Sequence, residues 1–180
     1  MESAAGGTLV KGTDRWIAPT YFRQDSELPS GKLAVFCDGK AGWISATQGR
    51  GPLAGAQLKQ VQGDLFRLYF RLLLSDRIEG RTVNALDDNT IEIVDTTGQT
   101  ARLELDADTR LPQRVTYEIA PAGRPPISAE ETWSDFQETA GVKVPYRVTV
   151  MQGGRKYAEM KVTDFKVNTG IRLEAIQQRP

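Results

Sequence analysis

The sequence predicts a single α+β domain that is mainly β, an antiparallel meander accompanied by one main helix. Most apolar segments of the 180-residue chain are short, alternate with polar residues and end at Gly, Pro, Asn or Asp, as strands do. Only one segment, at about 56–74, carries a clear helical repeat. We find no internal repeat and no linker, so we expect one domain that spans 1–180.

The first part of the chain is expected to form hairpins. Short apolar runs that read as strands lie at 8–12, 16–17, 21–24, 33–37 and 42–45. Asp38-Gly39-Lys40 separates the last two runs, and Asp-Gly between apolar runs is a strong hairpin signal because such turns need positive φ. Cys37 ends an apolar run, so we expect a buried, unreactive thiol. Residues 48–52 are predicted to be a loop.

The predicted helix at 56–74 has a narrow polar stripe and a wide apolar surface. Gln60, Asp64, Arg67 and Arg71 recur at helical spacing and form the stripe. The apolar residues cover an arc of about 200°, at roughly 100° per residue. One packing surface requires only roughly 100°. Two interpretations follow: the helix is deeply buried against a sheet, or it also lines an apolar cavity.

The second half of the chain is predicted to be almost entirely strand. The candidate strands are 82–86, 90–94, 101–105, 113–119, 130–139, 142–151 and 157–167. Strict alternation at 113–119 indicates one buried and one wet face. Turn residues separate the strands at the spacing of an antiparallel meander.

The composition argues against several classes of function. Lys+Arg and Asp+Glu are both 23, so the net charge is zero and nucleic acid is not an expected partner. The chain has no histidine, the commonest general base and metal ligand, so we expect no enzyme, no metal and no cofactor. No run reaches the ~20 apolar residues of a membrane span. Residues 1–7 do not have the pattern of a signal peptide.

The carboxylate pairs do not predict a catalytic site. Glu130 and Glu131 are adjacent, so in a strand their side chains point to opposite faces. Asp87-Asp88 and Asp106-Ala-Asp108 are better explained as turn residues. The segment at 106 also lacks the glycine and the distant glutamate of a calcium loop.

Two further groups have a binding interpretation and a simpler one. Trp16, Trp43 and Trp133 could be flat binding platforms, but core packing is the favoured interpretation. Arg67 and Arg71 could hold an anion. As members of the polar stripe they are instead expected to be solvated, with Asp64 able to pair with Arg67 at i, i+3.

Several short motifs occur in a characteristic order along the chain: Pro19-Thr-Tyr-Phe22-Arg23, Asp38-Gly39-Lys40 before Trp43, Leu111-Pro112, Asp135-Phe136, Gly141-Val-Lys-Val-Pro145-Tyr146 and Val162-Thr-Asp-Phe-Lys-Val-Asn168. In this order they resemble the LolA-like proteins, the periplasmic lipoprotein carriers and their relatives. The resemblance covers most of the chain, and the order of hairpins, apolar helix and strands matches as well.

This resemblance implies a curled antiparallel sheet, an incomplete β-barrel, with the helix on its concave side. It also implies a non-catalytic binding domain of the bacterial envelope, located in the periplasm, that holds a lipid, a lipoprotein acyl chain or another apolar small molecule. The expected cavity residues are Phe22, Phe36, Trp43, Leu65, Leu68, Tyr69 and Leu72. Where the lipoprotein carrier has an arginine before the proline that opens its strand, this sequence has Ala18, so lipoprotein transfer is not implied.

Two other functions stay open at this point. The chain could be a structural or interaction module with a protein partner, since a similar domain occurs appended to insulinase-like zinc metallopeptidases. It could also be an enzyme that uses carboxylates, tyrosine or lysine as its acid and base.

Overall fold

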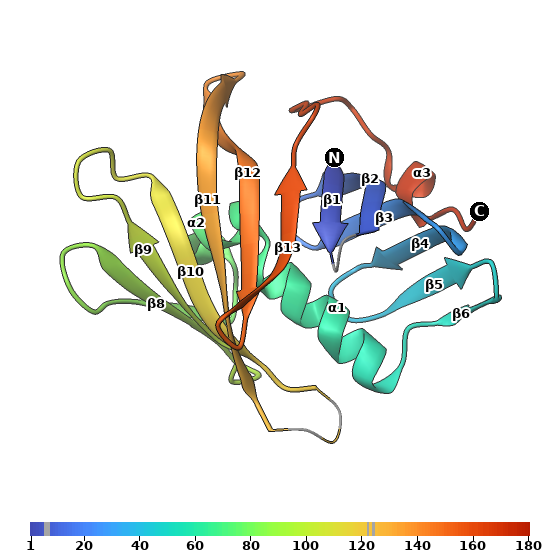
Figure 1. Ribbon diagram of the computed structural model, residues 1–180, viewed down its shortest axis with the longest axis horizontal. Helices are drawn as coiled ribbons and strands as arrows, with labels where there is room; N and C mark the ends of the chain where they lie inside the picture. Colours follow the sequence, from blue (N-terminus) through green and yellow to red (C-terminus); the bar gives the residue numbers. More distant parts are fainter. Residues whose placement is uncertain (6–7, 122, 124) are drawn as a thin grey trace.

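The computed structural model describes residues 1–5, 8–121, 123 and 125–180, which form one curled sheet around the central helices (Figure 1). The strands before the helices are β1 (Glu2–Ala5), β2 (Thr8–Ile17), β3 (Tyr21–Leu28), β4 (Gly31–Cys37), β5 (Gly42–Ala46) and β6 (Gly49–Pro52). The helical segments are α1 (Gly55–Arg67), α2 (Tyr69–Leu73), the 3₁₀ turn η1 (Ser75–Arg77) and α3 (Leu173–Gln177). The strands after η1 are β7 (Arg81–Ala85), β8 (Thr90–Asp95), β9 (Thr100–Leu105), β10 (Pro112–Ile119), β11 (Ile127–Thr139), β12 (Val142–Gln152) and β13 (Arg155–Lys161).

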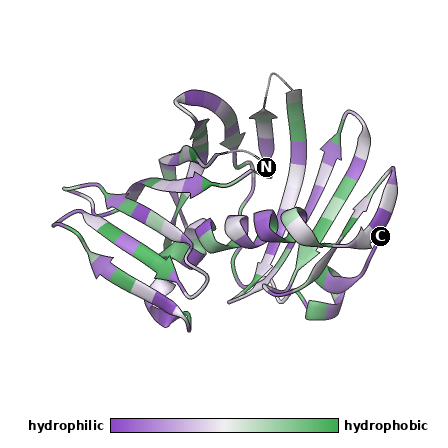
Figure 2. Cartoon of the chain, turned by 90° about the horizontal axis from the view of Figure 1, so that it is seen from below, coloured by the Kyte–Doolittle hydropathy of each residue, from purple (hydrophilic) through white to green (hydrophobic). Residues whose placement is uncertain are grey.

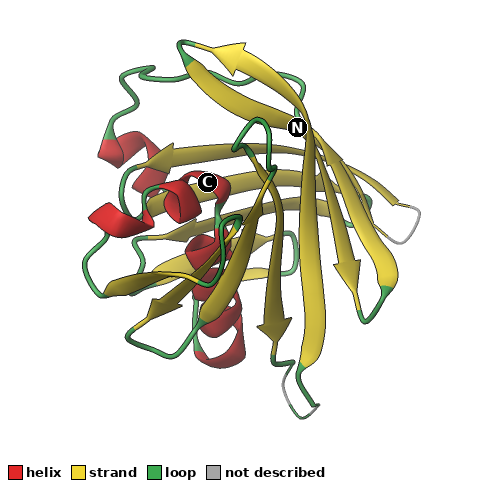
Figure 3. Cartoon of the chain, turned by 90° about the vertical axis from the view of Figure 1, so that its left-hand side faces the viewer, coloured by secondary structure: helices red, strands yellow, loops and turns green. Residues whose placement is uncertain are grey.

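The sheet consists of two meanders joined by their first and last strands. Within the described residues its order is β6-β5-β4-β3-β2-β1-β13-β12-β11-β10-β9-β8-β7, and every neighbouring pair is antiparallel. β1 pairs with β13, with Glu2 opposite Lys161 and Ala4 opposite Glu159. β6 and β7 remain as edges, so the sheet curls without closing, and α1 lies along its concave side (Figures 1 and 3). The predicted mainly-β fold with an incomplete barrel is confirmed.

Most of the predicted strands are present, but two whole strands, β1 and β6, were not predicted. β2 is one strand where the sequence predicts two, and β6 occupies the predicted loop at 48–52. β13 ends at Lys161, so residues 162–167 are not strand as predicted. The Asp38-Gly39 hairpin is confirmed: β4 pairs with β5, and the Asp38 carboxylate accepts the Lys40 and Ala41 backbone N–H groups at 2.8 and 2.7 Å.

The long predicted helix is wrong in one respect, because it is broken at Leu68. The backbone there is extended, with φ −53° and ψ 128°, so α1 ends at Arg67 and α2 begins at Tyr69. The apolar residues of the predicted helix are therefore carried by two short helices. The break lets α2 pack in another direction from α1 and divides the apolar residues between two surfaces.

Strand β4 is buried on both faces. Val35 and Cys37 pack with Leu53 and Leu65 on the side of α1. Ala34 and Phe36 alternate with them and pack on the other face with Ile176 of α3. Cys37 is fully buried, as predicted.

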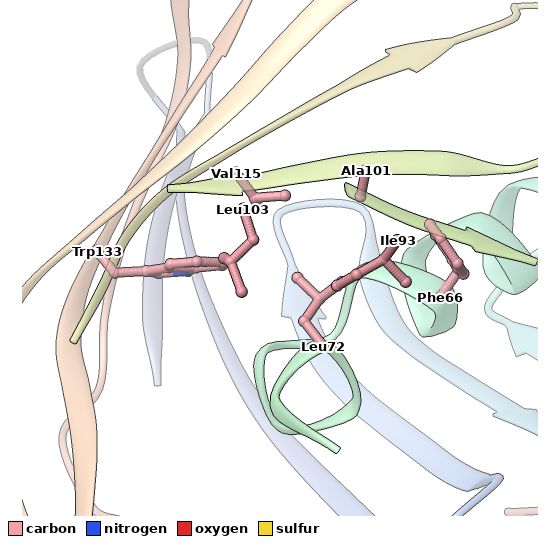
Figure 4. Packing of buried hydrophobic residues seen from close by; sticks show 7 residues of the cluster. All are labelled: Phe66, Leu72, Ile93, Ala101, Leu103, Val115 and Trp133. Atoms are coloured by element: carbon pink, nitrogen blue, oxygen red, sulfur yellow. The ribbon is translucent and has the colours of Figure 1, made fainter. Parts of the chain in front are cut away.

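A third cluster fills the concave side of the C-terminal meander. Its buried members come from α1, α2 and four strands, and their side chains point toward one another (Figure 4): Phe66, Leu72, Ile93, Ala101, Leu103, Val115 and Trp133. Colouring by hydropathy shows hydrophobic and hydrophilic residues alternating along many strands (Figure 2). This is the period of two expected for strands with one packed and one wet face.

None of the helices in the described part of the chain has the length and hydropathy needed to cross a membrane.

The contact of the short helix α3 with the outer face of the sheet can be tested by mutation. Ile176 is fully buried there, and the Trp43 indole donates a hydrogen bond of 3.0 Å to the Gln177 carbonyl oxygen. We expect Ile176→Ala to lower the free energy of unfolding by about 2–4 kcal/mol, through lost apolar contacts and a residual cavity. Ile171→Ala, at a side chain that is 39% exposed, is the control and should change it by less than about 1 kcal/mol. Equal losses in urea titrations of the two variants would contradict this packing.

Candidate functional site

The structure divides the seven predicted cavity residues between the two faces of the sheet. Phe22 packs against the cluster that contains Leu65, on the side of α1. Tyr69 and Leu72 belong to the cluster of the C-terminal meander, and Leu68 is half-buried at the helix break.

Phe36 and Trp43 lie on the opposite, outer face and pack against α3. They are register partners on β4 and β5, so they share a face. The prediction that these two residues share one cavity with the other five is therefore wrong. Phe36 alternates along β4 with Val35 and Cys37, which face α1.

Five aromatic side chains form a continuous group on the concave side, which we call the aromatic bridge: Trp16, Tyr69, Phe70, Trp133 and Phe165. Phe70 stacks on Trp16 with ring centroids 5.8 Å apart and on Phe165 at 5.3 Å. Tyr69 meets Phe70 and Trp133 edge-on, each at 5.1 Å. Because Trp16 is on β2 and Trp133 on β11, the bridge connects the two halves of the sheet through α2.

The aromatic bridge is incompletely buried. Trp133 is only 4% exposed, whereas Trp16, Tyr69, Phe70 and Phe165 are half-buried. The Tyr69 hydroxyl lies 3.4 Å from the Lys143 carbonyl oxygen, and burial raises the pKa of Tyr69 to about 12. The Trp16 Nε1–H is buried and has no hydrogen-bond acceptor among the described residues. The bridge therefore offers apolar surface and one free donor in the same place.

Sequence reasoning identified this group only in part. Trp16 and Trp133 are among the tryptophans interpreted as core residues, and Phe70 lies in the apolar arc of the helix. Phe165 follows β13 in a segment without regular structure, 95 residues from Phe70. Nothing in its neighbourhood in the sequence signals that contact.

The polar stripe is exposed at Gln60 and Asp64 and buried at Arg67 and Arg71. The prediction that the two arginines are solvated is therefore wrong. Both residues are 9% exposed. The Arg67–Asp64 pair is confirmed, at 2.8 Å, and the Arg67 guanidinium lies 4.1 Å from the centre of the Tyr117 ring. The curled sheet also packs against this side of the helix, and stacking on an aromatic ring gives the guanidinium a favourable environment there.

Glu131 is a carboxylate on the concave face. The Tyr117 hydroxyl donates a hydrogen bond of 2.9 Å to it, and burial raises its pKa above the ordinary value of 4.5. Glu130 points to the other face, 3.7 Å from Arg114. The two adjacent carboxylates are therefore on opposite sides of β11, as predicted.

The other acidic pairs belong to turns, as predicted. The Asp87 carboxylate accepts the Asn89 backbone N–H at 2.8 Å, and the Asp106 carboxylate accepts that of Thr109 at 2.8 Å. In the part of the chain that the structure describes, no three Asp, Glu or Cys side chains are grouped closely enough to hold a metal ion.

Two open depressions lie on the outer face of the sheet. One is lined by residues of β1, β2 and β13, including Leu9, Tyr157 and Lys161. The other lies beside α3 and is lined by Arg15, Arg23 and Asp25, with the Arg23–Asp25 ion pair at 2.8 Å. Both are on the side of the sheet away from the aromatic bridge.

No protein-family model matches the sequence, and no curated protein matches it significantly. The structure is similar to the crystal structure of LolA superfamily protein NE2245 from Nitrosomonas europaea, with a TM-score of 0.56 and 16% sequence identity. The similarity covers 99% of this chain and 89% of that chain. The fold is therefore LolA-like along nearly the whole chain.

The raised pKa of Glu131 predicts that the stability of the folded protein depends on pH. Because its pKa is higher in the folded protein than in the unfolded chain, folding takes up a proton between the two values, and stability falls as pH rises through that window. Glu131→Gln keeps an acceptor for Tyr117 and removes the ionisable group. We expect it to raise the melting temperature at pH 7, with the gain disappearing below the unfolded pKa of about 4.3.

The matched control is Glu130→Gln, the same change on the neighbouring residue. Glu130 faces Arg114 on the outer side, so this variant should show no gain at pH 7. Thermal unfolding of both variants between pH 4 and 8 checks the expectation. A lower melting temperature for Glu131→Gln at pH 7 would show that the ionised carboxylate is favoured.

Proposed function

We propose that this protein is a non-catalytic binding domain that holds a lipid, a lipoprotein acyl group or another apolar ligand on the concave side of the sheet. The observation that carries this proposal is the aromatic bridge, which joins both halves of the sheet while four of its five side chains stay half-buried. The LolA-like fold supports the same class of function and a periplasmic location.

A ligand bound at the aromatic bridge would replace contacts that these aromatic side chains make with one another. Phe70 and Phe165 stack on each other between α2 and the segment after β13, and both are partly exposed. α2 has only five residues and is separated from α1 by the extended Leu68, so its movement would leave α1 unchanged. Each methylene that an alkyl chain buries there would contribute about 0.8 kcal/mol, without any catalytic group.

We propose eight contact residues. Five of the sequence-predicted residues remain, and three members of the bridge join them: Phe22, Leu65, Leu68, Tyr69, Leu72, Trp16, Phe70 and Phe165.

A second candidate function is docking of a protein partner on the outer face. Leu9 and Tyr157 are 59% and 54% exposed and line the same depression over β1, β2 and β13. Exposed apolar side chains around a depression are typical of interaction surfaces. A module of this kind, such as a non-catalytic domain beside an insulinase-like peptidase, would need no small ligand.

The three tryptophans provide a test that separates these functions. Trp16 and Trp133 belong to the bridge, whereas Trp43 is buried on the outer face against α3. Replacing two tryptophans by phenylalanine at a time leaves one reporter in each protein. We expect dibromostearate, whose bromine atoms quench tryptophan fluorescence on contact, to quench Trp16 saturably and to leave Trp43 unchanged.

Stearate without bromine is the control for indirect changes in fluorescence. Equal quenching of Trp16 and Trp43 would indicate nonspecific adsorption, and an absence of saturable quenching at both bridge tryptophans would leave the outer-face function as the better proposal.

A further inference from the structure

Two guanidinium groups beside the aromatic bridge have no carboxylate partner among the described residues. Arg71 is 9% exposed, and its buried Nε–H donates no hydrogen bond. Arg81 donates to neutral oxygens, those of Arg71 and Ser75, both at 2.8 Å, and that of Phe66 at 2.8 Å. It also lies 4.5 Å from the centre of the Phe66 ring. Neither cation is neutralised in the way that Asp64 neutralises Arg67.

Asp95 is the one acidic group that influences the pKa of both arginines, but its oxygens accept hydrogen bonds from a turn. Its Oδ1 accepts hydrogen bonds from the Thr97 backbone and hydroxyl, at 2.8 and 2.7 Å, and from the Gln99 backbone at 3.0 Å. Its Oδ2 accepts one from the Gln99 side chain at 3.1 Å. The carboxylate therefore serves the turn between β8 and β9.

The remaining charge is costly in this place. Burial lowers the pKa of Arg71, and burial together with the Arg71 cation lowers the pKa of Arg81 to about 10. Guanidinium groups nevertheless stay charged at neutral pH. Buried charges in proteins are normally paired, because an unpaired one loses its hydration without compensation. A bound anion would supply the missing partner.

The cationic pair and the aromatic bridge lie on the same surface. Arg71 follows Phe70 in α2, and its charge is near enough to influence the pKa of Cys37. Cys37 is opposite Phe22, which is opposite Trp16, on three neighbouring strands. Because strands are spaced about 4.8 Å apart, Cys37 and Trp16 are separated by roughly 10 Å. The two places are therefore close together on the concave side of the sheet.

We infer that Arg71 and Arg81 bind the anionic head group of an amphiphile, a carboxylate or phosphate, whose apolar chain lies along the aromatic bridge. This inference rests on the proposed function and defines its ligand class as anionic lipids such as fatty acids. Guanidinium groups suit this task because their fork of donors matches the two oxygens of a carboxylate or phosphate. The unpartnered Trp16 Nε1–H is a further donor along the same surface.

The test compares oleate with oleyl alcohol, two probes with the same chain and different head groups, as competitors of dibromostearate at pH 8. We expect the wild-type protein to bind oleate roughly tenfold or more tightly than the alcohol, the ratio that a charge-assisted hydrogen bond gives. Arg71→Met should weaken oleate binding to the level of the alcohol. Arg77→Met is the matched control, since it removes one positive charge at a side chain that is 78% exposed and should keep the preference.

Folding of the variant gives an independent readout. If Arg71 lacks a partner in the protein without ligand, replacing it by a methionine of similar length should raise the melting temperature, by roughly 2–4 °C. A fall in the melting temperature would show that the protein already satisfies the Arg71 charge, and it would overturn the inference.

The remaining outcomes separate the inference from the proposed function. Equal affinity of the wild-type protein for oleate and oleyl alcohol would overturn the head-group site and leave the apolar binding function in place. Binding of neither probe would overturn both. If inorganic phosphate raises the melting temperature of the wild-type protein as much as oleate does, and does not raise that of Arg71→Met, the site takes a free oxyanion. The amphiphile is then overturned as the source of the anion.

Discussion

The pairing of β1 with β13 is the constraint on which the rest of the structure depends. Each meander is local along the chain, because every strand pairs with the next, but this pair joins residues about 160 positions apart. It turns two sheets into one, and the right-handed twist of that sheet curls it around α1. The concave side exists only because this contact forms, and the helices that connect the meanders must then lie inside it (Figure 1).

The break at Leu68 determines what the concave side contains. α1 extends along the sheet and places Leu65 against β4, whereas α2 places Phe70 and Tyr69 between the two halves. A straight helix of the predicted length would continue in the direction of α1. One part of the wide apolar arc is deep core, as the first interpretation predicts, and another part belongs to the half-buried aromatic bridge.

The same curvature explains why the two arginines of the polar stripe, Arg67 and Arg71, are buried. A flat sheet would leave the far side of the helix in water, but the curled sheet surrounds it and brings Tyr117 and Glu131 close to Arg67. Arg67 has Asp64 as a local partner at i, i+3. Among the described residues Arg71 has no such partner, so this part of the interior retains positive charge. This combination of aromatic surface and unpaired cation is the basis of the ligand class that we propose.

The sequence alone determined the features that depend on neighbouring residues: most of the strands, though not β1 or β6, the Asp38-Gly39 hairpin, the helical region, and the opposite faces of Glu130 and Glu131. These follow from side-chain period and turn chemistry, which act over a few residues. The tertiary structure decided which face of the sheet each apolar residue occupies. Phe36 and Trp43 therefore lie on the outer face and pack against α3. It also brought Phe165 to Phe70 and buried Arg71. Such outcomes depend on contacts between distant segments, and local periodicity carries no information about the partner across the sheet.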